Sequence, residues 1–123
     1  MKWDFSSDAP IYAQLILQIK VGIVSGVLPP GERIVPVREL AAEAGVNPNT
    51  MQRALMELER DGLVYSQRTT GRFVTEDKAV VQKAKQELAR QHIEAFLQGM
   101  MALGYQKEEL VSLLRQQIQE EEK

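Results

Sequence analysis

The chain contains no cysteine, only one histidine and few aromatic residues, which make up 6% of the sequence. Without cysteine it forms no disulfide and no thiolate metal site, and with His92 alone a metal ion would depend on carboxylates that do not cluster. No apolar run approaches the length of a membrane-spanning helix, and no signal-like segment follows Met1. We therefore expect a cytoplasmic protein without a cofactor and without membrane contact.

The sequence also lacks the residue combinations on which enzymes depend. It has no glycine-rich loop suited to phosphate and no nucleophile with a general base beside it. His92 lies four residues from both Leu88 and Phe96, which is the spacing of one helix face. We interpret His92 as a packing or interface residue and expect no catalytic activity.

The chain also has no excess of positive charge. The net charge is −2, and each side of residue 76 carries −1, from eight Lys/Arg against nine Asp/Glu and from seven against eight. Nucleic-acid-binding domains are usually basic, so total charge argues against such a function. However, every cation from Arg33 to Arg72 is an arginine, whose planar guanidinium suits phosphates and guanine edges.

An apolar content of 44% predicts a globular chain with room for one small domain and an appendage. A first helix is expected after Asp8, the predicted N-cap, and it should end at Ser25-Gly26. Its apolar positions recur every three or four residues and comprise Tyr12, Leu15, Ile16, Ile19 and Ile23. Residues 33–35 are long enough only for a short strand, which we expect to pair with a later hairpin.

Two helices joined by a short turn follow. Pro36 should open the first, and Gly45 is suited to the left-handed position that ends it. Only Val46 separates Gly45 from Asn47, the expected N-cap of the next helix, whose first residue is Pro48. Such a short link forces the helices to cross steeply, as in a helix-turn-helix unit.

The second of these helices is expected to bury one stripe and expose polar residues opposite it. The expected buried stripe comprises Met51, Ala54, Leu55 and Leu58, and the outward residues are Asn49, Thr50, Gln52, Arg53 and Met56. Asn, Gln and Arg side chains can read base edges through paired hydrogen bonds. An ordinary solvated helix face is the alternative explanation of this pattern.

A small β-hairpin is expected next, from residues 63–66 and 72–74 joined by residues 67–71. Its tip carries Arg68, Thr70, Gly71 and Arg72, and such a tip can reach phosphates or the minor groove. Two helices across a tight turn and a hairpin make the outline of a winged helix-turn-helix. The fold class is therefore mainly α with a small β-hairpin, with a DNA-binding domain over residues 1–76.

Six motifs occur in order from residue 10 to residue 74. They are Pro10-Ile11-Tyr12-Ala13-Gln14-Leu15, Gly26-Val27-Leu28-Pro29-Pro30-Gly31-Glu32-Arg33, Val37-Arg38-Glu39-Leu40-Ala41, Gly45-Val46-Asn47-Pro48-Asn49-Thr50, Ala54-Leu55-Met56-Glu57-Leu58-Glu59-Arg60-Asp61-Gly62-Leu63-Val64 and Gly71-Arg72-Phe73-Val74. Together they resemble the N-terminal domain of the GntR family of bacterial transcription regulators. The Asn-Pro-Asn-Thr helix start and the short helical C-terminus resemble its YtrA subfamily in particular.

The resemblance implies a sequence-specific regulator, commonly a repressor of a transporter operon. It implies DNA contacts by Arg38, Asn47, Asn49, Thr50, Gln52 and the wing from Arg68 to Arg72. The chain departs from the family in three places: it lacks a serine before the Arg38 helix, it has Pro48 where an arginine often reads guanine, and it has Thr69 at the first wing glycine. The second departure shifts expected base reading toward Arg38, Asn49, Gln52 and Arg53.

Residues 77–123 are expected to form two helices that are broken at Gly104 and serve dimerisation. The first helix begins with a narrow apolar stripe but becomes apolar around its circumference from Ile93 to Leu103, which requires burial on more than one side. Because a unit this small has no core of its own, we expect a second copy of the chain to cover its apolar surface. A two-fold homodimer in turn implies an inverted-repeat operator. The expected interface comprises Leu88, His92, Ile93, Phe96, Leu97, Met100, Met101, Leu114 and Ile118.

The residues alone leave two other classes of function open. The acidic balance favours a protein-protein adaptor built on the same scaffold, because a fold does not determine its function. An RNA-binding protein is a further alternative, although stacking aromatic residues are scarce. The sequence identifies no small-molecule effector.

Overall fold

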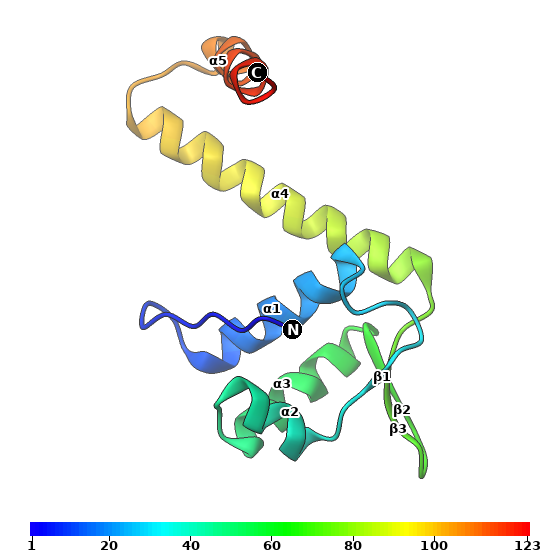
Figure 1. Ribbon diagram of the computed structural model, residues 1–123. Helices are drawn as coiled ribbons and strands as arrows, with labels where there is room; N and C mark the ends of the chain where they lie inside the picture. The colour runs from blue at the N-terminus through cyan, green and yellow to red at the C-terminus, as the bar shows by residue number, and fades with distance from the viewer. The chain divides into compact units, whose positions relative to one another are not determined.

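The computed structural model describes residues 1–123 as five helices and a three-stranded sheet (Figure 1). The elements are α1 (Ile11–Ser25), β1 (Arg33–Ile34), α2 (Val37–Ala44), α3 (Pro48–Arg60), β2 (Val64–Gln67), β3 (Gly71–Val74), α4 (Lys78–Ala102) and α5 (Lys107–Glu121). The chain divides into two compact units, Met1–Lys85 and Gln86–Lys123. The predicted fold class, mainly α with a small hairpin, is confirmed.

The core of the first unit is built from the apolar stripes of its three helices and from the hairpin. Its buried members are Leu15, Ile19, Ile23, Leu40, Ala41, Met51, Ala54, Leu55, Leu58, Leu63, Val64 and Val74. Val80, Val81 and Ala84 of α4 pack against this core. The first unit therefore extends to Lys85, whereas the predicted domain boundary followed residue 76.

The start of α1 differs from the expectation. Asp8 is not the N-cap; Pro10 holds that position, with an extended ψ of 142° and no side-chain cap. The side chain of Gln14, one turn into the helix, instead holds the preceding segment. Its Nε2 donates to the carbonyl oxygens of Ser6 and Ala9 at 2.8 and 2.7 Å. Because Gln14 folds this segment back onto α1, the carboxylate of Asp8 is not needed at the helix terminus.

The turn between α2 and α3 agrees with the prediction. Gly45 adopts a φ of 72°, the left-handed conformation that glycine reaches without steric cost. The side-chain oxygen of Asn47 accepts a hydrogen bond from the backbone N–H of Asn49 at 2.7 Å, and Pro48 is the first helical residue. These three adjoining signals leave only three residues, 45–47, between the end of α2 and the start of α3.

The sheet has the order β1-β3-β2, with both pairs antiparallel, so the predicted pairing of the short strand with the hairpin is confirmed. Gln67 pairs with Gly71, so the wing turn is three residues long rather than the five expected. β2 begins at Val64, one residue later than expected, because the backbone N–H of Leu63 still donates to the carbonyl oxygen of Leu58 in α3 at 3.0 Å. We call the hairpin of β2 and β3 the wing.

The second unit contains the later part of α4 and all of α5. Gly104 has a φ of 98° and separates the two helices, as predicted. The side chain of Glu109 accepts from the backbone N–H of Gln106 at 2.9 Å and so caps the start of α5. None of the helices is both long enough and apolar enough to span a bilayer.

Candidate nucleic-acid interface

The N-terminal half of α3 presents polar side chains away from the core. The buried stripe of α3 is fully inaccessible, while Asn49, Arg53 and Met56 are exposed and Thr50 and Gln52 are half-buried. The predicted division of this helix into an inner and an outer face is therefore confirmed. A helix of this size with exposed amide and hydroxyl groups in its first turns has the dimensions and donors for major-groove contact.

Arg38 lies in the first turn of α2 and is exposed, without an ion-pair or hydrogen-bond partner in the structure. Pro36 precedes the helix and provides no side-chain cap. The backbone N–H groups of the first turn are therefore free to donate, and the partial positive charge of the helix terminus adds to that of Arg38. This corner of the unit is suited to a phosphate or to a base edge rich in acceptors.

Several of the predicted DNA-contacting residues have partners within the chain, beginning with Asn47 and Arg53. The oxygen of the Asn47 side chain caps α3, which leaves only its amide N–H groups for a ligand. The guanidinium of Arg53 lies 4.5 Å above the ring of Tyr12 in α1. This stacking holds Arg53 against the edge of α1, although its side chain stays exposed.

The tip of the wing is supported from the neighbouring strand. Arg33 of β1 donates from Nε to the carbonyl oxygen of Thr70 at 3.0 Å, and a side chain at Gly71 would approach that Nε to 3.2 Å. Arg68 is exposed and unpaired at the tip. Thr69 has a φ of 68°, so the chain keeps the left-handed turn without the glycine that favours it. The turn thus presents Arg68 outward on a supported backbone.

Arg72, the second arginine of the wing, points inward instead of outward. Its side chain is only 19% exposed. Its Nη1 donates to the side-chain oxygen of Gln52 at 3.1 Å, and its Nε lies 3.5 Å from a carboxylate oxygen of Glu59. Ser66, which pairs with Arg72 across the hairpin, donates from its hydroxyl to the same Glu59 oxygen at 2.5 Å. Arg72 therefore fastens the wing to α3 rather than extending the positive surface of the tip.

Sequence reasoning missed this network, although the strand period contains the signal. Side chains on a strand alternate between faces, so Arg72 and Val74 share one face, as do Ser66 and Val64. Both valines are buried, so the two polar residues face α3 as well. The partner Glu59 was missed because it lies two turns beyond Gln52 on the same helix, past the expected DNA-reading half.

The predicted dimer interface forms an open apolar surface on the second unit. His92, Ile93, Phe96, Met101, Leu114 and Ile118 are exposed, and Leu97 and Met100 are half-buried. A groove of about 400 Å³ between α4 and α5 is lined by His92, Ile93, Phe96, Leu97, Leu110, Val111 and Leu114. Leu88 is the one predicted residue that its own chain already buries, so it offers little surface to a partner.

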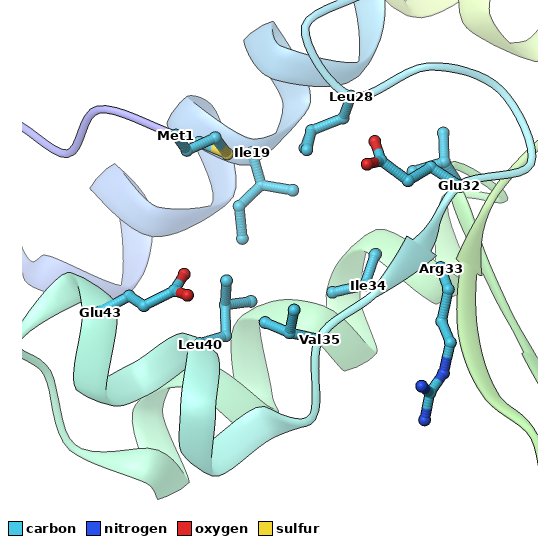
Figure 2. Close-up of a pocket in the computed structure, with 10 residues that line it drawn as sticks. Met1, Ile19, Leu28, Glu32, Arg33, Ile34, Val35, Leu40 and Glu43 are labelled. Atoms are coloured by element: carbon cyan, nitrogen blue, oxygen red, sulfur yellow. The ribbon is translucent and has the colours of Figure 1, made fainter.

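A cavity of about 150 Å³ in the first unit is lined mainly by apolar side chains, and Figure 2 shows Ile19, Leu28 and Leu40 directed toward one another. The side chain of Arg33 points away from them in the same view. No group of three His, Cys, Asp or Glu side chains is placed to hold a metal ion.

Three helices around one core, a steep turn before α3 and a wing fastened to α3 define a winged helix-turn-helix domain of the DNA-binding kind. The model of the bacterial regulatory proteins of the gntR family matches residues 11–74. The chain belongs to the GntR family of DNA-binding transcription regulators, which are not enzymes.

The relatives and the solved structures agree with this assignment. The uncharacterized regulator YhcF of Bacillus subtilis is 41% identical to this chain, and the match covers 87% of this chain and 88% of YhcF. The transcriptional repressor YtrA of the same organism is 32% identical, and the match covers 87% of this chain and 83% of YtrA. A GntR family regulator from Listeria monocytogenes superimposes with a TM-score of 0.83 at 38% identity, covering 91% of this chain and 98% of that one. AraR(DBD), solved in complex with operator ORX1, covers 61% of this chain and 96% of its own with a TM-score of 0.55 and 30% identity. The YtrA-like resemblance drawn from the motifs is confirmed.

Proposed function

We propose that the protein is a transcriptional repressor that binds an inverted-repeat operator as a homodimer. The observation that carries the proposal is a set of exposed side-chain donors without a partner in the chain: Arg38 on α2, Asn49 at the start of α3 and Arg68 on the wing. The relative YtrA is a repressor, and the structural relative AraR is seen on an operator. Both support the same kind of function for this chain, and an operator target implies a place in the cytoplasm beside the chromosome.

The dimer follows from the apolar surface of the second unit. Phe96 is 37% exposed, Leu114 46% and Ile93 57%, all around one groove in which His92 is the one polar lining residue. Several large apolar side chains exposed next to one another are typical of protein interfaces rather than of monomer surfaces. A second copy of the chain would cover the groove with the same residues, as two-fold symmetry requires.

Dimerisation would also explain how a first unit with few free arginines binds DNA tightly. With Arg72 paired to Glu59 and Arg60 paired to Glu57, few arginines remain free to neutralise phosphates. A single unit would bind weakly and with a small dependence on salt. Two linked units bind with the second half-site already at high effective concentration, which raises affinity without further contacts.

The proposal is tested by footprinting the full chain on the DNA upstream of its own coding sequence. We expect a protected region with two mirrored half-sites whose centres are about 10 bp apart, or a multiple of that distance. Sedimentation at micromolar concentration should give a dimer. Absence of protection at every salt concentration would instead favour a protein-protein adaptor.

The regulated genes are proposed from the family resemblance, which points to a transporter operon. Deletion of the gene should raise the level of the transcripts next to the footprinted operator if the protein is a repressor. A fall in those transcripts would make it an activator and would contradict the proposed sign of regulation.

A further inference from the structure

Arg72 determines which atoms of the Gln52 side chain are available to DNA. The hydrogen bond from Arg72 Nη1 to Gln52 Oε1 is 3.1 Å long. An arginine side chain only donates hydrogen bonds, so the atom that faces it must be the amide oxygen rather than the amide nitrogen. The orientation of the Gln52 amide is therefore fixed by the chemistry of its partner.

The partner is itself held in place. Arg72 lies on the inner face of β3, opposite Ser66, and both side chains meet the same carboxylate oxygen of Glu59. Gln52 and Glu59 are two turns apart on one face of α3, so the guanidinium spans the gap between them. Movement of Arg72 would cost both contacts, and the amide of Gln52 keeps its NH₂ group free.

This orientation changes the base that Gln52 can read. A free glutamine commonly reads adenine in the major groove by accepting from N6 and donating to N7. The amide oxygen has a second lone pair, but an adenine amino group placed there would bring its hydrogens next to the guanidinium of Arg72. Guanine presents two acceptors, O6 and N7, at the same edge and suits a group that only donates.

We propose that Gln52 selects guanine over adenine at one position of each operator half-site, and that Arg72 is the positioning residue that imposes this choice. The inference rests on the proposed DNA-binding function and adds a specificity to it. Arg72 acts through Gln52 and does not itself contact the base.

Selection of bound duplexes from a randomised library, with the full-length chain, tests the proposal. The wild-type chain should enrich guanine at a position that loses its preference in Gln52→Ala, which identifies the position read by Gln52. In Arg72→Met the ratio of guanine to adenine at that position should fall about tenfold. Arg72→Thr, which keeps a strand-favouring side chain but removes the guanidinium, should give the same result and replaces Arg72→Met if that variant does not fold by circular dichroism.

Three comparisons separate positioning from other roles. Arg72→Lys keeps a cationic donor and should retain most of the guanine preference, whereas Arg68→Met should weaken all sequences alike. Arg72→Met added to Gln52→Ala should not change base preference further. Adenine at the Gln52-dependent position of the wild type, or an unchanged preference in both Arg72→Met and Arg72→Thr, would overturn the inference alone. Failure of the wild-type chain to enrich any sequence would overturn the proposed function with it.

Discussion

Arg33 donates a hydrogen bond to the carbonyl oxygen of Thr70, 37 positions further along the chain, at 3.0 Å. This contact supports the turn of the wing from β1, while Arg72, just after the turn, fastens β3 to α3. The wing is therefore held at two places, and Arg68 is the arginine that it leaves free. The predictions for the wing arginines differ accordingly.

Arg68→Ala should weaken binding to all DNA sequences and flatten its salt dependence, because Arg68 is expected to neutralise a phosphate. The slope of log affinity against log salt should fall by about one unit per lost contact, or about two for a dimer. Fluorescence anisotropy across a salt series measures it. Arg60→Ala, which removes an arginine already paired to Glu57 at 2.9 Å, is the matched control and should leave the slope unchanged. Equal slopes for wild type and Arg68→Ala would mean that the wing does not reach the backbone.

Arg38→Ala should cost about 1–3 kcal/mol of operator binding and relax selectivity at one base position, because Arg38 is exposed and unpaired beside α3. Affinities for an operator and for its single-base variants provide the measurement. The same Arg60→Ala variant controls for loss of charge and should keep full selectivity. If Arg38→Ala bound with unchanged affinity and selectivity, the role assigned to Arg38 would be wrong.

Thr69→Gly should stabilise the first unit by about 0.5–1 kcal/mol, because a β-branched residue is strained at a φ of 68°. The gain is smaller than the strain, since glycine also raises the entropy of the unfolded chain. Chemical denaturation measures the free energy of unfolding. Thr70→Gly is the control; it has no positive φ to relieve and loses the 3.1 Å bond from its hydroxyl to Gln67, so it should destabilise. A loss of stability in Thr69→Gly would contradict the assigned strain.

Phe96→Glu should convert the dimer to a monomer and weaken operator binding strongly, because it places an unpaired charge in the apolar groove. Sedimentation at micromolar concentration and an anisotropy titration report the two effects. Gln98→Glu adds the same charge at an exposed polar position of α4 and should leave both unchanged. A dimer that persists in Phe96→Glu would place the interface elsewhere.

The bounds of the helices were predictable where the determining signals are local. Asn47 and Pro48 mark the start of α3, and Gly45 marks the end of α2, within four residues of sequence. The buried stripe of α3 follows from its period alone. These features need no information about the rest of the chain.

The features that were missed depend on partners far away in the sequence. The start of α1 is organised by Gln14, whose side chain folds the preceding segment back. The prediction of Asp8 as the N-cap used the local sequence alone and was wrong. The inward turn of Arg72 depends on Gln52, 20 positions earlier. Counting arginines on the wing treats Arg68 and Arg72 alike, whereas Arg68 lies in the exposed turn and the pleat of β3 directs Arg72 toward α3.

The central claim is that this chain recognises a particular DNA sequence, and one competition experiment tests it most directly. The affinity of the full chain for the duplex upstream of its own coding sequence is measured against that for a scrambled duplex of equal length and composition, at one physiological salt concentration. We predict that the upstream duplex is bound at least about a thousandfold more tightly. Equal affinity for the two duplexes, or binding to neither, would contradict the account.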